Sequence, residues 1–185
     1  MILFRILSSL IILFTIFVNP VYSARDTNSY DGNIFPIYAG NGSLVPPQST
    51  LTESLKNERT SVLVFYLDDS STSKTFAPVV SGIKLLWSSS VDLIPIAIDE
   101  IDNDDKKSYK DPGYYWHGKI PQLVILDGKG NILLDKNGQV SFDEINDAIT
   151  KATGLKKPDF DLTVKSFNEY NSEPSKDGYT RPRGS

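Results

Sequence analysis

One stretch, residues 61–86, constrains the fold of this 185-residue chain more than any other. It begins with an apolar run, Ser61 to Leu67, whose branched and aromatic side chains suit a buried strand. A short polar segment follows, in which several hydroxyl residues can cap a helix. Apolar residues then recur at helical spacing, namely Phe76, Val79, Val80, Ile83 and Leu86. The stretch therefore predicts a buried strand that turns directly into an amphipathic helix.

The turn between this strand and this helix resembles the active-site turn of thioredoxins. In that family an aromatic pair leads to the motif W-C-G-P-C-K, and an alanine and a proline follow one turn into the helix. The matching positions here are Phe65 and Tyr66, then residues 69–74, then Ala77 and Pro78. The resemblance implies an α/β, thioredoxin-like fold, with a mixed central sheet flanked by helices.

The residues that perform redox chemistry in thioredoxins are absent. Both cysteine positions of the motif are serines, Ser70 and Ser73, and the whole chain contains no cysteine. The position of the buried acid that assists proton transfer in the family holds Val64. Because a serine hydroxyl has no accessible two-electron couple, exchange through a mixed disulfide is excluded.

A second point of resemblance is the dipeptide Ile120-Pro121, which precedes an apolar run, Gln122 to Leu126. In thioredoxins a cis-proline at this place faces the active-site turn, and its neighbouring backbone can pair with an extended peptide. A fold can readily hold an X-Pro bond in the cis form. The alternative is that Pro121 only ends a loop before a strand, where proline is common.

Local patterns predict the remaining elements of the domain. Ser49 or Thr50 can cap a short helix that ends near residue 57, with Glu53 placed for a capping box if Thr50 is the cap. Ser141 and Glu144 form a capping box for a helix that ends at Gly154. Further strands are predicted at residues 91–98, 122–126 and 132–134, the last two joined by the glycine-rich connection 127–131. Pro95 lies inside the first of these strands, so it must occupy a bulge or an unpaired position.

The ends of the chain differ in composition from this domain, which we place at residues 49–156. Residues 1–24 combine one positive charge with a short apolar segment and small residues at Ser23 and Ala24, which is typical of a signal peptide. An uncleaved membrane anchor is the alternative. Residues 25–48 are expected to be a polar linker, and residues 157–185 a C-terminal extension that is flexible and largely disordered at its end.

Charge and metal-ligating residues exclude several functions. A net charge of -4 gives no electrostatic footprint for nucleic acid. The acidic segment 99–112 lacks the ligand spacing of a calcium loop, and His117 is the only histidine. Nothing resembles the G-x-S-x-G turn of a serine hydrolase. We therefore expect no metal and no cofactor.

A narrower resemblance covers roughly residues 50–170. The runs FYLDDSSTSKTFAPVVS and IPQLVILDGKGNILLDKNGQVSFDEI are similar to the cyanobacterial thioredoxin-like family called thylakoid membrane photosystem I accumulation factor. That resemblance implies an exported protein in the thylakoid lumen or membrane, with the periplasm as the alternative. It also implies a role in supporting or regulating photosystem I accumulation, with a photosystem I subunit or an assembly component as the protein partner.

Two classes of function remain open. The first is a non-catalytic binding or assembly factor that holds an extended protein segment in the groove between turn 68–74 and residues 120–122. The second is an enzyme that uses Ser70 or Ser73 as a nucleophile, which would need a general base that the sequence does not supply. We favour the first and expect no enzymatic activity. The candidate partner-binding residues are Tyr66, Asp68, Asp69, Ser70, Ser73, Lys74, Trp116, Ile120, Pro121 and Gln122.

Overall fold

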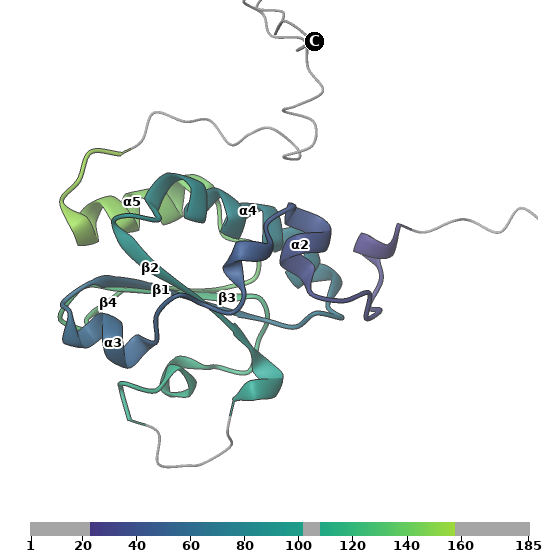
Figure 1. The fold of residues 1–185 in the computed structure, drawn as a ribbon, viewed down its shortest axis with the longest axis horizontal. Helices are drawn as coiled ribbons and strands as arrows, with labels where there is room; N and C mark the ends of the chain where they lie inside the picture. Colours follow the sequence, from purple (N-terminus) through teal and green to yellow (C-terminus); the bar gives the residue numbers. More distant parts are fainter. Residues whose placement is uncertain (1–22, 102–107, 158–185) are drawn as a thin grey trace, which may run out of the picture.

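The computed structural model describes residues 23–101 and 108–157 (Figure 1). The predicted signal peptide as far as residue 22, the centre of the acidic segment, and the C-terminal extension from residue 158 lie outside the described residues. Within the described ranges, no helix is both long enough and apolar enough to cross a membrane.

A four-stranded sheet forms the centre of the molecule, with the strands in the order β2-β1-β3-β4. The bounds are β1 (Thr60–Tyr66), β2 (Val91–Ala97), β3 (Gln122–Leu126) and β4 (Ile132–Asn137). β2 runs parallel to β1, whereas β3 is antiparallel to both β1 and β4. A parallel pair joined by a crossover helix and followed by an antiparallel hairpin is the thioredoxin-like fold that the sequence predicts.

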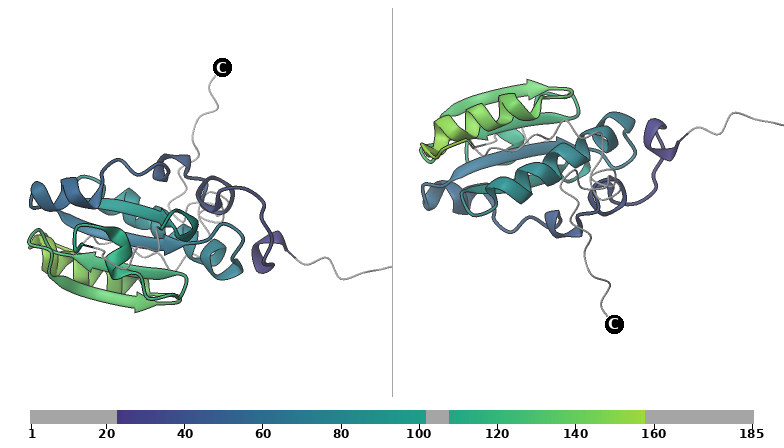
Figure 2. Two further views of the ribbon diagram at one scale, coloured as in Figure 1. Left: turned by 90° about the horizontal axis from the view of Figure 1, so that it is seen from below. Right: turned by 90° about the horizontal axis from the view of Figure 1, so that it is seen from above.

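Helices cover both faces of this sheet (Figures 1 and 2). One face carries α2 (Ile34–Ala39), α4 (Ser71–Trp87) and α5 (Phe142–Thr153), and the other carries α3 (Leu51–Lys56). Single turns of 3₁₀ helix complete the described part of the chain: η1 (Ala24–Asp26), η2 (Gly42–Leu44), η3 (Ile98–Glu100) and η4 (Pro112–Tyr115).

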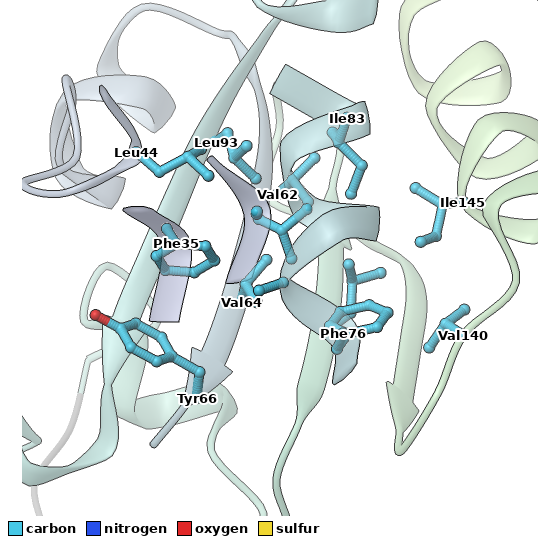
Figure 3. Packing of buried hydrophobic residues seen from close by; sticks show 14 of the residues in the cluster. Phe35, Leu44, Val62, Val64, Tyr66, Phe76, Ile83, Leu93, Val140 and Ile145 are labelled. Atoms are coloured by element: carbon cyan, nitrogen blue, oxygen red, sulfur yellow. The ribbon is translucent and has the colours of Figure 1, made fainter. Parts of the chain in front are cut away.

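β1 supplies the core on both sides of the sheet, and all of its residues are buried. Because side chains alternate along a strand, Val62, Val64 and Tyr66 pack towards α2 and α4, as Figure 3 shows. Leu63 and Phe65 pack towards α3. The helical spacing read from the sequence is confirmed in α4, where Phe76, Val80 and Ile83 are buried against the first set.

The structure corrects the expectation of a polar linker at residues 25–48. Asn33 caps α2, and the side chains of Ile34 and Phe35 are completely buried. The Phe35 ring packs edge-on against Tyr66, with 4.9 Å between the ring centroids. The chain then passes the β2 edge of the sheet and reaches α3 on the opposite face. The domain therefore includes residues that lie well before position 49.

Pro95 is accommodated because β2 is an edge strand. It stands in regular register opposite Val64, so of the two expected positions the bulge is excluded and the unpaired position remains. An edge strand leaves alternate N–H groups without a partner strand, so that a residue lacking this donor is tolerated there. The two predicted caps are confirmed, with a full capping box between Thr50 and Glu53 and a left-handed Gly154 after α5.

Truncation of Phe35 tests whether α2 is part of the folded domain. We expect Phe35→Ala to lower the free energy of unfolding by about 3–5 kcal/mol, because it leaves a cavity beside Tyr66. Ile37→Ala is the matched control, since Ile37 lies in the same helix but is 49% exposed. Urea unfolding of both variants measures the difference, and equal free energies would mean that α2 does not stabilise the domain.

Candidate functional site

The candidate site lies at one end of the sheet, where β1 ends and β3 begins. Phe65 near the end of β1 pairs with Gln122 at the start of β3. The peptide bond between Ile120 and Pro121 is cis, as predicted. The turn that leads into α4 follows β1 directly, so both sides of the predicted groove start from paired residues of neighbouring strands.

The hydroxyls of the two motif serines serve the local structure. Ser70 is the N-cap of α4, and its Oγ accepts a hydrogen bond from the Ser73 N–H at 3.4 Å and lies 2.8 Å from Thr72 Oγ1. Ser73 is buried, and its Oγ accepts from the Leu67 N–H at 3.2 Å. Neither hydroxyl has an acid or a base as a hydrogen-bond partner among the described residues.

Gln122 is completely buried and joins the loop before Pro121 to the sheet. Its Nε2 donates to the carbonyl of Tyr115 at 2.7 Å and to Asp135 Oδ1 at 2.9 Å, and its Oε1 accepts from the His117 N–H at 3.0 Å. The other carboxylate oxygen of Asp135 lies 2.8 Å from His117 Nε2. Gln122 is therefore a structural residue, and the prediction that it contacts a partner directly is wrong for this conformation.

Lys74 is likewise not available to a partner in this structure. Its side chain is completely buried, and Nζ lies 2.6 Å from Asp31 Oδ2. Burial alone would lower the pKa of Lys74, but the hydrogen bond to Asp31 and the nearby charges raise it above its ordinary value. The expectation that Lys74 contacts a partner is thus corrected for this conformation.

Tyr66 and Asp68 also bind the segment that precedes α2. The Tyr66 hydroxyl accepts from Asn33 Nδ2 at 3.1 Å, and Asp68 Oδ1 accepts from the Ile34 N–H at 2.9 Å. Burial raises the pKa of Tyr66 to about 12. Burial also raises the pKa of Asp68, although the bond from Ile34 opposes the shift. Tyr66 is buried and Asp68 only partly exposed, so neither offers its whole side chain to a partner.

The exposed part of the site is smaller than the sequence suggests. Asp69 is exposed, whereas Ser70, Trp116 and Ile120 are partly exposed. Trp116 packs on Phe65, with 5.4 Å between the ring centroids. In residues 23–101 and 108–157, no hydrogen bond reaches the N–H or the carbonyl of Ile120, while the carbonyl of Pro121 accepts from Gly138. We call Asp69, Ser70, Trp116 and Ile120 the contact surface.

Several residues of the site could not be identified from the sequence. Asn28 and Asp31 bond to α4 from 43 positions away, and Asp135 joins the Gln122 network from the adjacent strand. Polar residues in a segment rich in Asn, Ser and Asp give no signal of such contacts. Among the described residues, no three His, Cys, Asp or Glu side chains gather as a metal site would require.

No protein-family model matches this chain. The thylakoid membrane protein slr1796 of Synechocystis sp. is 38% identical over 153 residues, which span 82% of this chain and 76% of that protein. The exposed lipoprotein thioredoxin Etrx1 of Streptococcus pneumoniae aligns with a TM-score of 0.42 and 14% identity, over 52% of this chain and 89% of that one. The structure of MTB dsbF aligns with a TM-score of 0.41 and 19% identity, over 52% and 82%.

Replacement of Gln122 tests its structural role. We expect Gln122→Met to lower the free energy of unfolding by about 1–3 kcal/mol, because it leaves buried groups on Tyr115 and Asp135 without their partner. Gln139→Met is the control, since Gln139 is exposed and makes a single bond to the Thr72 carbonyl. Urea unfolding compares the two, and hydrogen exchange should show faster exchange of the His117 amide only in the first. An unchanged His117 amide would contradict this role.

The ion pair between Asp31 and Lys74 predicts that the stability of the domain depends on pH. The hydrogen bond from Lys74 is the main cause that lowers the pKa of Asp31 below its ordinary value of 3.8. The stability contributed by Asp31 is therefore present above about pH 3.8 and is lost as the pH falls through the lowered pKa. We expect the stability difference between the wild type and Asp31→Asn to stay constant near neutral pH and to shrink as the pH falls below about 3.8, as measured by urea unfolding. A constant difference would show that the pair does not act through its charge.

Proposed function

The chain belongs to the same family as the thylakoid membrane protein slr1796, and we propose on this premise that it is a non-catalytic binding factor at the thylakoid. Its role in this proposal is to support or regulate the accumulation of photosystem I. The domain is exported and acts in the thylakoid lumen or at the thylakoid membrane. The name of the relative supports this compartment, and so does the apolar segment at the start of the sequence.

The single observation that supports a non-catalytic role is that serines occupy both cysteine positions of the motif. Thioredoxin chemistry needs a pair of sulfur atoms at the start of α4, and this chain has no cysteine. The serines that stand there cap the helix and fix the preceding turn, so their hydroxyls serve the fold. The protein therefore keeps the scaffold without the reacting atoms.

The contact surface offers what an extended protein segment needs. The N–H and carbonyl of Ile120 can form main-chain hydrogen bonds with a partner strand. Trp116 adds an aromatic surface that is held in place by Phe65, and Asp69 adds an exposed negative charge. A partly exposed aromatic side chain of this kind is typical of protein interfaces. We expect a photosystem I subunit or an assembly component to bind here.

The alternative, an enzyme with a serine nucleophile, has less support from the geometry. An activated serine needs a base within hydrogen-bond reach. The only histidine of the chain, His117, is bonded to Asp135, and within the described residues the hydroxyls of Ser70 and Ser73 bond only to main-chain N–H groups and another hydroxyl.

The experiment compares partner capture and photosystem I levels across three variants. We expect Ser70→Ala/Ser73→Ala to keep both, with a stability loss of about 1 kcal/mol for each bond removed. Ile120→Arg should lose both, because a long charged side chain then stands beside the backbone groups that bind the partner. Ile132→Arg is the matched control, since Ile132 is 51% exposed at the start of β4.

The measurements are affinity capture from thylakoid membranes with mass spectrometry, and the photosystem I content of cells that carry each variant. A folded double-alanine variant without function would contradict the binding proposal and favour a serine enzyme. Equal capture by the two arginine variants would show that the partner binds elsewhere.

A further inference from the structure

Residues 24–33, which we call the strap, lie along the first turns of α4. The 3₁₀ turn η1 lies beside that helix, at the end of the molecule where the described part of the chain begins (Figures 1 and 2). This is also the end at which the candidate site is found, because α4 begins directly after the Ser70 cap. The strap therefore covers one side of α4, the helix whose first turn forms one side of the predicted groove.

Lys74 holds the strap by its ammonium group. Nζ donates to Asp31 Oδ2 at 2.6 Å and to main-chain carbonyls of the strap: Ala24 at 3.0 Å, Thr27 at 3.1 Å and Ser29 at 2.6 Å. An ammonium has only three N–H donors, so these oxygens share them. One side chain of α4 thus binds an extended piece of main chain together with one carboxylate.

Further polar contacts fix the strap near its start and in its middle. Asn28 Oδ1 accepts from the N–H of Ser71, the first residue of α4, at 3.0 Å. The guanidinium of Arg25 donates to the Thr75 carbonyl at 3.5 Å. We call Tyr66, Ser71, Lys74 and Thr75 the cradle, since each of them bonds to the strap.

The strap contributes nothing to the apolar core. Every one of its side chains is exposed or partly exposed, and burial begins with Ile34, immediately after the strap. Gly32 has a φ of +109°, a conformation that favours glycine, and it marks the change from strap to helix. The side-chain contacts that hold the strap are hydrogen bonds and one ion pair, and its separation would uncover the completely buried side chain of Lys74.

Separation of the strap would leave no charge buried without a partner. Lys74 is buried by the strap and by Tyr38, whose ring lies 5.3 Å from Nζ, so water would reach the ammonium once the strap moved away. Water oxygens would then take the place of the strap's oxygens around the ammonium, so that opening exchanges its hydrogen bonds and does not simply remove them. Segments with few apolar contacts are the ones that open most readily in a folded protein.

We propose that the strap is displaceable, and that the cradle then takes an extended, aspartate-bearing segment of a protein partner in its place. This inference rests on the proposed binding function and adds its regulation, because the chain's own strap competes with the partner. A segment with free carbonyls and one carboxylate can reproduce the contacts of Lys74, and a side-chain oxygen can replace Asn28 at the Ser71 N–H.

The first test uses the uncleaved full chain, in which Arg25 is an internal residue, and trypsin, which cleaves after Arg25 only when the strap is free. Proteolysis of an opened segment follows the population of the open form. We expect cleavage at Arg25 to be about ten-fold faster in Asp31→Ala and in Lys74→Met than in the wild type. The matched controls are Tyr30→Ala in the strap, since Tyr30 is 74% exposed, and Lys84→Met in α4, and both should be cleaved at the wild-type rate. Unchanged rates in the two test variants would overturn the proposal.

The second test uses a fluorescent peptide with the sequence of residues 23–34 as the probe. It should bind the Asp31→Ala chain, whose cradle is open, and bind the wild type and Asp26→Ala at least about ten-fold more weakly, because their straps compete. A peptide with Asn at the position of Asp31 should also bind about ten-fold more weakly. Equal binding of either peptide to all three chains, or no binding to any, would overturn the proposal. So would a dimer of Asp31→Ala in size-exclusion chromatography, which would indicate exchange of straps between copies.

Neither test involves a thylakoid partner, so the two proposals can fail separately. If cleavage and peptide binding behave as expected but Ile120→Arg captures the same proteins as Ile132→Arg, the strap is displaceable and the contact surface is wrong. If capture depends on Ile120 but cleavage at Arg25 is unchanged, the binding function stands without a displaceable strap.

Discussion

Burial of β1 on both faces is the constraint on which the rest of the structure depends. Val62 and Val64 contact the helices on one side of the sheet, and Leu63 and Phe65 contact the layer around α3 on the other. A strand that is apolar on both faces must lie in the centre of a three-layer domain. Its position fixes where the turn into α4 begins and, through its pairing with β3, where Pro121 lies. The position of the candidate site therefore follows from the packing of β1 in the core.

Much of the fold could be predicted because its signals are local. The apolar run of β1, the helical spacing of α4 and the cap of α5 all involve residues within a few positions of one another. The segment around α2 escaped prediction because a helix of six residues shows less than two turns of periodicity. The role of Lys74 could not be read from the sequence, since a lysine in a polar turn is normally exposed. Its oxygen partners stand 43 to 50 positions earlier, and only the fold brings them together.

The candidate site shows how a thioredoxin-like scaffold without cysteine is held together at the start of α4. The hydroxyls of Ser70 and Ser73 accept hydrogen bonds from main-chain N–H groups there. The Gln122 amide joins the loop before Pro121 to the sheet, and both of its N–H donors and its oxygen are used. The polar side chains at this end of the sheet therefore serve the fold.

The passage of the chain from α2 to α3 has a consequence for how the protein behaves at high concentration. Leu44 lies beside Leu93 (Figure 3), and the residues that follow it run close to β2, the strand that also contains Pro95. The strand at the opposite edge of the sheet is β4, which carries Asp135 and Lys136. An exposed edge strand can pair with an edge strand of another molecule and so begin a fibre. Proteins prevent this pairing with prolines, charges and covering segments at the edge. This domain has a proline, charges and a covering segment at the two edges of its sheet, and all three disfavour pairing between the sheets of two molecules.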